Sequence, residues 1–320
     1  VKMKKEDKRD PEKVYNIYTI EKLRKEFPKF NWGNFFRACE VKTKQILIED
    51  VNYLKKFTEI FDDTSIEVLR SMIIYKLILS VANTMDDSIE ELIFDFYGKF
   101  LTGKKERKSK WKRCIEFVSS EVGELLSQKY IEKHFPSKCK KFMVELVENL
   151  KTAYKNRIKK IKWMEKKTKE KALEKLKKMN YKIGYPDEFK DYSKINITSE
   201  KSLLDNVLAI NKFQYEYEMK FLYREPDPKE WEMMAYDINA YFHPLKNEIV
   251  FPAGILQEPF FSLKLSLPEI YGGIGAIIGH EITHGFDDQG KKFDANGNMK
   301  QWWTKKDEKK YAENAKKIIN

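Results

Sequence analysis

Several common signatures are missing from this chain of 320 residues. No apolar run approaches the roughly 18 residues that a membrane-spanning helix requires, and the nearest, residues 72–85, is interrupted by Lys76. The three cysteines, Cys39, Cys114 and Cys139, form neither a CxxC pair nor a cluster with histidine, which argues against a structural metal site. Because their number is odd, one thiol is free or pairs outside this chain. The sequence therefore predicts no transmembrane segment and no cysteine-based metal site.

Specific recognition of nucleic acid is also not indicated, although the formal net charge is +12. Residues 151–180 hold 13 Lys or Arg and 3 Asp or Glu, a net charge of +10. Apolar residues recur there at helical spacing, so a lysine-rich solvated face on a packed helix explains the charge. The sequence contains no recognised nucleic-acid-binding module and no zinc-finger spacing. Binding of polyanions would be a side property rather than a function.

Histidine is scarce, with four in the chain, yet two of them stand in the pentapeptide His280-Glu281-Ile282-Thr283-His284. On a helix, residues four apart face the same side, so these two imidazoles can bind one Zn²⁺. Glu281 then lies beside the metal, where a carboxylate can accept a proton from activated water. The alternatives are a chance match, or two buried structural histidines. The motif predicts one zinc per chain, with His280 and His284 as ligands and Glu281 as general base.

The flanking residues support a helix through this motif. Ile274, Ile278, Ile282 and Phe286 recur every four residues and predict a buried stripe, with the histidines on another face. Two consecutive glycines before Ile274 can supply the turn that starts the helix. The glycine and histidine that extend the motif in metzincins are absent.

Most of the remaining sequence also has helical periodicity. The predicted helices include residues 51–61, 66–80, 89–98, 114–130, 139–164 and 202–223. Residues 183–187 are the strongest break and predict a division into residues 1–182 and 183–320. Residues 238–242 and 248–251 read as a β-hairpin. An exposed edge strand beside a metal can pair with an extended peptide, although an ordinary hairpin is equally compatible with the pattern. The predicted fold is mostly α, with a short β-hairpin.

Several segments resemble the neprilysin family of zinc endopeptidases. They are NAYF at 239–242, NEIVFPAGILQ at 247–257, PFF at 259–261, YGGIG at 271–275, IGHEITHGFDD at 278–288 and QWWT at 301–304. The match is dense over residues 239–304 and continues more weakly upstream. The resemblance implies an extracellular or cell-surface protein, secreted or anchored as a type II membrane protein. It also implies two lobes, a helical capping lobe (1–182) and a thermolysin-like lobe (183–320) that bears the zinc.

The resemblance further implies an endopeptidase of small to medium peptides that cleaves before hydrophobic residues. In the family pattern His280 and His284 bind zinc and Glu281 is the general base. The remaining positions that match are Asn239 and Ala240 for the substrate backbone, Ile255, Phe260 and Ile277 for the pocket after the scissile bond, and Asp287 and Asp288 for orienting the ligand histidines. In a secreted protein, the Asn-x-Thr sequon at Asn196 would be a glycosylation site.

The chain also departs from the family pattern. The family's third zinc ligand is a glutamate in an ExxxD motif about sixty residues beyond the second histidine, and neither Glu308 nor Glu313 has an aspartate four positions later. The family's downstream His and Arg, which hold the substrate, are not found. Cys114 matches a cysteine whose family partner lies upstream of the region covered. Two interpretations remain, a piece of an active peptidase or a shortened, inactive paralogue that binds peptides; the intact motif favours the first.

Overall fold

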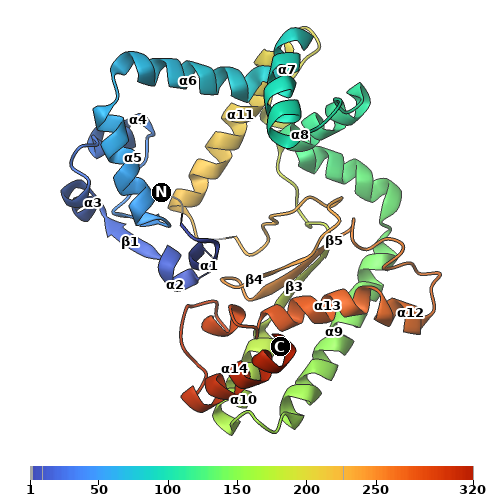
Figure 1. Cartoon of the computed structure of the whole chain (residues 1–320). Coiled ribbons are helices and arrows are strands. Elements are labelled where there is room, and N and C mark those ends of the chain that lie inside the picture. Colours follow the sequence, from blue (N-terminus) through green and yellow to red (C-terminus); the bar gives the residue numbers. More distant parts are fainter. Residues whose placement is uncertain (1–2, 9, 226, 320) are drawn as a thin grey trace. The chain divides into compact units, whose positions relative to one another are not determined.

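The computed structural model describes residues 3–8, 10–225 and 227–319. These residues form two compact units, the first ending at Arg107 and the second beginning at Lys108 (Figure 1). Helices make up most of both units, which confirms the prediction of a mostly α protein with few strands. Within these residues, no helix combines the length and apolar character needed to cross a bilayer. The predicted boundary between residues 182 and 183 falls inside a strand of the second unit, and the division into capping and zinc-bearing lobes stays a prediction.

The first unit consists of helices and one two-stranded antiparallel sheet. Its elements are α1 (Lys5–Lys8), α2 (Pro11–Val14), β1 (Asn16–Thr19), α3 (Ile20–Glu26), α4 (Trp32–Ala38), β2 (Gln45–Ile48), α5 (Val51–Asp63), α6 (Ile66–Val81), η1 (Ala82–Thr84), α7 (Asp87–Ile93) and the π-helical η2 (Phe94–Phe100). A small cluster of buried side chains joins β1, β2, α3 and α4: Tyr18, Leu23, Phe27, Trp32 and Ile48. The indole of Trp32 donates to the Phe27 carbonyl oxygen at 3.0 Å, so its polar atom keeps a partner inside this cluster.

Helix α6 differs from the other helices in its distribution of apolar residues. Apolar side chains occur on every side of it, as the consecutive residues 72–75 show. Most of them are exposed: Ile66, Val68, Met72, Ile73, Ile74, Tyr75, Leu77 and Ile78. The α6 sequence therefore has no single apolar face that determines which way the helix packs.

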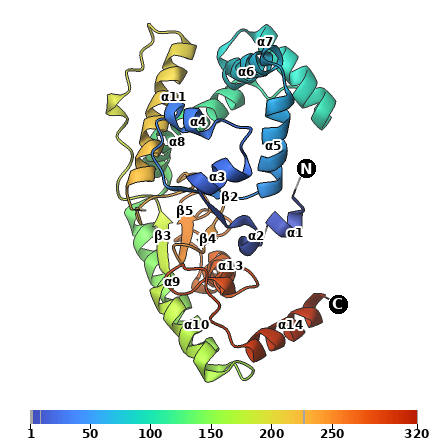
Figure 2. The ribbon, with the colours of Figure 1, turned by 90° about the vertical axis from the view of Figure 1, so that its left-hand side faces the viewer.

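The second unit contains longer helices and a three-stranded sheet. Its elements are α8 (Lys110–His134), α9 (Ser137–Lys160), α10 (Lys166–Lys178), β3 (Asn180–Gly184), η3 (Tyr192–Lys194), α11 (Leu203–Met219), η4 (Lys220–Tyr223), β4 (Tyr241–His243), β5 (Glu248–Pro252), α12 (Leu267–Gly272), α13 (Ile274–His284), η5 (Gly290–Lys292) and α14 (Lys305–Ile319). Helix α10 folds back along α9, and α13 lies against α9 and β4 (Figures 1 and 2).

The sheet of the second unit has the order β3-β5-β4. The central strand β5 is buried along its whole length, pairs parallel with β3 and pairs antiparallel with β4. The predicted hairpin is confirmed, and its turn contains Asn247 at φ 45°, a left-handed conformation that asparagine tolerates. Strand β4 is an edge of this sheet. It begins at Tyr241, so residues 238–240 lie before the strand rather than in it.

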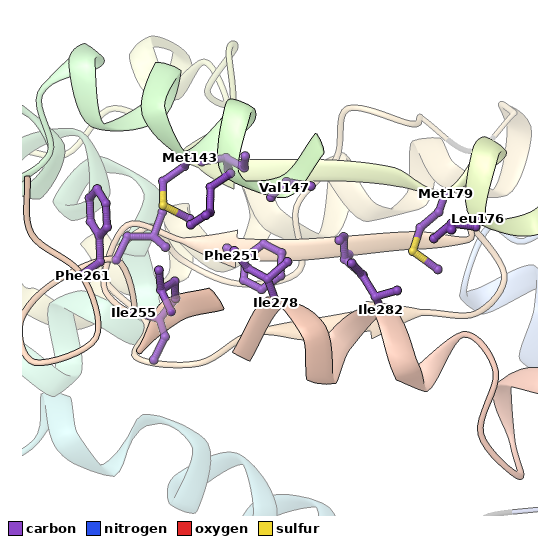
Figure 3. Close-up of a cluster of buried hydrophobic side chains, with 14 of the residues drawn as sticks. Met143, Val147, Leu176, Met179, Phe251, Ile255, Phe261, Ile278 and Ile282 are labelled. Atoms are coloured by element: carbon purple, nitrogen blue, oxygen red, sulfur yellow. The ribbon is translucent and has the colours of Figure 1, made fainter. Parts of the chain in front are cut away.

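One apolar core joins this sheet to the helices around it. Met143 and Val147 from α9, Phe251 from β5, and Ile278 and Ile282 from α13 converge in this core (Figure 3). Their burial supplies the main stabilising free energy of the unit. The core therefore fixes the position of α13 relative to β5 and α9.

Three features of the fold differ from the sequence-based expectation. Strand β3 was not predicted, because its short sequence, Asn-Tyr-Lys-Ile-Gly, forms a strand only through distant pairing with β5. The antiparallel pairing of β1 with β2 was likewise missed, because α3 and α4 separate the two strands in the sequence. The helix predicted over residues 89–98 instead changes at Phe94 from α7 into the π-helical η2. Local periodicity does not specify any of these features.

The start of α13 is set by a close backbone approach. A Cβ on Gly273 would lie 2.5 Å from the Phe260 carbonyl oxygen, so only glycine fits. The same carbonyl accepts a hydrogen bond from the Ile274 N–H at 2.9 Å. The predicted glycine turn is therefore present, and it attaches the first residue of α13 to the segment that contains Phe260.

Candidate metal centre

The histidine motif lies on the last turns of α13, as its sequence predicts. Ile274, Ile278 and Ile282 are fully buried, whereas Phe286, beyond the end of the helix, is only half-buried. In Figure 3, Ile278 and Ile282 lie on the side of α13 that faces the core. Because the helix is anchored through this face, the orientation of its other residues follows from the 3.6-residue repeat.

The two histidines converge on one point. The Nε2 atoms of His280 and His284 are 2.9 Å apart, and the ring planes are nearly perpendicular, at 86°. Two nitrogens bound to one tetrahedral zinc at about 2.0–2.1 Å lie roughly 3.3 Å apart. The observed spacing therefore fits a shared ion with only a small adjustment of the rings.

Glu281 completes a group of three side chains able to bind a metal. One ligand-type atom from each of His280, Glu281 and His284 lies within 4.8 Å of the others, and the described part of the chain contains no second group of this kind. Glu281 is buried, with 6 % of its surface exposed. Burial raises the pKa of its carboxyl group, and the two nearby histidines oppose this rise. A carboxylate with a raised pKa is suited to accept a proton and return it.

Of the two aspartates predicted to orient the ligands, Asp287 contacts a histidine. Its Oδ2 lies 2.7 Å from His284 Nδ1, so the ring N–H can donate to the carboxylate and leave Nε2 available for a metal. Its Oδ1 accepts from the backbone N–H groups of Gln289 and Gly290, at 2.9 and 2.7 Å. Asp288 accepts from the Gln289 side chain instead. No hydrogen bond joins Asp288 to either histidine in the described structure, and its role in orienting them stays a prediction.

Two further residues beside this site were not identified from the sequence. Tyr154 on α9 donates to Thr283 Oγ1 at 3.2 Å, and its ring stacks on Phe286, which ties α9 to the end of α13. Lys175 on α10 was counted within a solvated lysine face, but it is fully buried and donates to the Gly290 and Phe293 carbonyl oxygens. That interpretation was wrong for Lys175. The available signal was its spacing: Lys175 lies three residues after Ala172, which places it on the apolar stripe of α10.

The predicted substrate-binding residues lie on three segments: the residues before β4, the segment after β5, and α13 itself. Asn239 is exposed, Ala240 is half-buried, and the Asn239 side chain accepts from the Ala240 N–H at 2.9 Å, just before edge strand β4. Ile255 is buried, and Phe260 and Ile277 are half-buried against the main core. The structure thus places all five in the second unit with the motif. Their roles in binding substrate stay predictions.

Family models described as peptidase family M13 match residues 1–186 and residues 239–320. The chain belongs to peptidase family M13. It is 32% identical over 317 residues to human membrane metallo-endopeptidase-like 1, covering 93% of this chain and 40% of that protein. Human neprilysin is 30% identical over 338 residues, with 99% and 45% covered. The resemblance to the neprilysin family is therefore confirmed.

Solved structures of M13 peptidases share the fold. The crystal structure of the Mycobacterium tuberculosis zinc metalloprotease ZMP1 in complex with inhibitor has a TM-score of 0.89 and 36% identity, covering 98% of this chain and 47% of that chain. PEPO from Lactobacillus rhamnosis has a TM-score of 0.86 and 26% identity, covering 97% and 49%. The chain thus spans less than half the length of these relatives. Family membership and the His/Glu/His group together imply a metal cofactor.

Proposed function

We propose that the protein to which this chain belongs is a zinc-dependent endopeptidase that hydrolyses internal bonds of small to medium peptides. The observation that carries the proposal is the geometry on α13, where two imidazole Nε2 atoms 2.9 Å apart stand beside the buried carboxylate of Glu281. His280 and His284 would hold the zinc. When bound, zinc supplies a Lewis acid that polarises the peptide carbonyl and activates water for attack.

Glu281 has the role of general base and then general acid. It accepts the proton of the attacking water and delivers it to the leaving amine, which a carboxyl group with a raised pKa does readily. Asp287 fixes the His284 ring through Nδ1, so that Nε2 faces the ion. Each of these steps is supported by a distance or by the burial of the group.

The substrate backbone would lie extended beside edge strand β4. Asn239 and Ala240 precede this strand, and an edge strand presents unpaired backbone groups to an extended peptide. Ile255, Phe260 and Ile277 would receive a hydrophobic side chain just after the scissile bond. Burial of that apolar side chain would supply binding free energy, which supports cleavage before hydrophobic residues.

A catalytic zinc site ordinarily has three protein ligands, and the described residues supply two histidines beside the base. We infer that the third ligand is a glutamate of an ExxxD motif elsewhere in the longer protein. We place that protein outside the cell or at its surface, secreted or membrane-anchored. Asn196 lies exposed between η3 and α11, where a glycan could be attached. Within the described residues no disulfide joins Cys39, Cys114 and Cys139 to one another, and pairing with a cysteine elsewhere stays a prediction.

The direct test is Glu281→Gln in the full-length protein, with the exposed Glu313→Gln as matched control. Glu281→Gln should keep its zinc, and its rate of hydrolysis of a quenched hydrophobic peptide should fall by about 10²- to 10⁴-fold. The control should keep full activity, and a chelator should abolish it. Activity that persists in Glu281→Gln refutes the assigned base. Wild-type protein that binds zinc and peptide without cleaving it would instead support the inactive paralogue.

A further inference from the structure

The side chain of Lys175 reaches from α10 into the segment that follows the histidine motif. Its Nζ atom lies 2.7 Å from the carbonyl oxygens of both Gly290 and Phe293. The Phe293 carbonyl also accepts from the Trp302 indole at 3.0 Å. Three aromatic rings surround the ammonium group, with centroids 5.6–5.9 Å from Nζ: Phe242, Phe286 and Trp302. Two backbone carbonyl oxygens and three aromatic rings therefore form the surroundings of the Lys175 ammonium group.

Burying a charge at this position has an energetic cost. Lys175 is fully buried, whereas Lys171 and Lys177 on the same helix are exposed. Burial lowers the pKa of Lys175 to about 8, although Asp287 and Asp294 oppose the shift. An apolar side chain would fill the same space without desolvating an ammonium group. The specific contribution of lysine is its set of donors, which reach two carbonyls at once.

Gly290 connects this lysine to the metal centre. Its carbonyl oxygen accepts from Lys175, and its N–H donates to Asp287 Oδ1 at 2.7 Å. The other oxygen of Asp287 faces His284 Nδ1. Gly290 also packs so closely on the His284 carbonyl that a Cβ would lie 1.8 Å from that oxygen. The segment from Asp287 to Gly290 is therefore held on one side by the ligand helix and on the other by Lys175.

We propose that Lys175 is a positioning residue for the metal centre, which holds residues 290–293 in place so that Asp287 keeps the His284 imidazole directed at the ion. The inference rests on the proposed function, because it assumes that His284 is a ligand. The role proposed for Lys175 requires no contact with the ion or with the substrate. It acts through Gly290 and Asp287.

The first test measures metal affinity rather than activity. Lys175→Met removes the donors and the charge but keeps much of the volume, and Lys177→Met on the exposed side of α10 is the matched control. Zinc affinity is measured in the full-length protein by competition with a chelator, and the cobalt-substituted protein gives a spectrum of the ligand geometry. We expect Lys175→Met to weaken zinc binding by about 10-fold or more and to alter the cobalt spectrum, with the control unchanged. Wild-type affinity and spectrum in Lys175→Met would overturn the proposal.

A double-mutant cycle separates positioning from general stability. In an Asp287→Ala background, Lys175→Met should weaken zinc binding little further, because the lysine acts through that aspartate. Full additivity of the two losses contradicts the proposed route. If Lys175→Met does not fold, Gly290→Ala displaces the same segment from its other side, and unchanged zinc affinity in that variant also overturns the proposal. Wild-type protein that binds no zinc refutes the proposed function itself, whereas zinc binding that is insensitive to Lys175 refutes only this inference.

Discussion

Helices α6 and α13 are both rich in isoleucine, yet they have opposite surroundings. In α6, of the first unit, apolar residues occur on every side and most are exposed. In α13, of the second unit, Ile274, Ile278 and Ile282 form one face that is fully buried, and the histidines occupy another. The separation of faces, rather than apolar content, determines how a helix is oriented. A helix anchored through one face presents its functional side chains in one defined direction.

One ion pair from each unit shows a similar contrast between buried and exposed side chains. In the second unit Lys182 and Glu248 form a buried ion pair at 2.7 Å, with side chains 8% and 2% exposed. In the first unit Lys29 and Asp62 form a pair at 3.1 Å, with side chains 50% and 44% exposed. A buried charge depends on its partner because water cannot replace it. The packing of the second unit is therefore specified by polar as well as apolar contacts.

Removing the lysine of each ion pair should produce the largest difference between the two units in the loss of stability. Lys182→Met leaves Glu248 buried without its cation and should lower the free energy of unfolding of the second unit by about 3–5 kcal/mol. Lys29→Met should change the first unit too little to measure, because water screens that pair. Hydrogen exchange read separately for the two units provides the measurement. Equal effects would show that burial does not distinguish the two pairs.

A second pair of substitutions compares the two helices directly. Ile278→Ala opens a cavity in the core of the second unit and should cost about 2–5 kcal/mol. Ile73→Ala, on the exposed surface of α6, should change stability by about 0.5 kcal/mol or less. Urea unfolding of both variants tests the difference. A loss in Ile73→Ala as large as that in Ile278→Ala would mean that α6 is covered in solution.

The buried Lys175 should make the stability of the second unit depend on pH. The folded pKa of Lys175 is about 8, below its ordinary value of 10.5, so between these values the unfolded chain binds more protons than the folded one. Relative to Lys175→Met, the wild type should therefore become more stable as the pH rises from 8 to 10.5, by up to roughly 3 kcal/mol. Below pH 8 the difference should be constant. Unfolding titrations of both proteins across pH 7–11 measure this difference, and a flat profile throughout contradicts a lowered pKa.

Removing a helix cap should have the smallest effect on stability, and the effect should be similar in both units. Asp50 accepts from the Tyr53 N–H at 2.8 Å at the start of α5, and Ser202 accepts from the Asp205 N–H at 3.0 Å at the start of α11. Replacing either with alanine should cost about 1 kcal/mol, because capping depends on local geometry. Local hydrogen exchange in α5 and α11 provides the measurement. A clear difference between the two losses would show that tertiary context also determines the strength of a cap.

Much of the candidate site could be predicted from the sequence because the determining interactions are local. The spacing of His280 and His284, and the repeat of Ile274, Ile278 and Ile282, define a helix with two faces without reference to any other segment. The hairpin was also recognisable, since its strands are close in sequence. Strand β3 was not, because its pairing with β5 joins Asn180 to Glu248 across 68 residues.

The sequence by itself determined the helical character of the chain, the motif on α13 and the identity of the group beside the two histidines. Only the tertiary structure decided that Lys175 donates to the Gly290 and Phe293 carbonyl oxygens, and that β3 pairs with β5. These outcomes depend on which segments meet in space. Lys175 and Gly290 are 115 residues apart, and no periodic pattern within either segment records that contact.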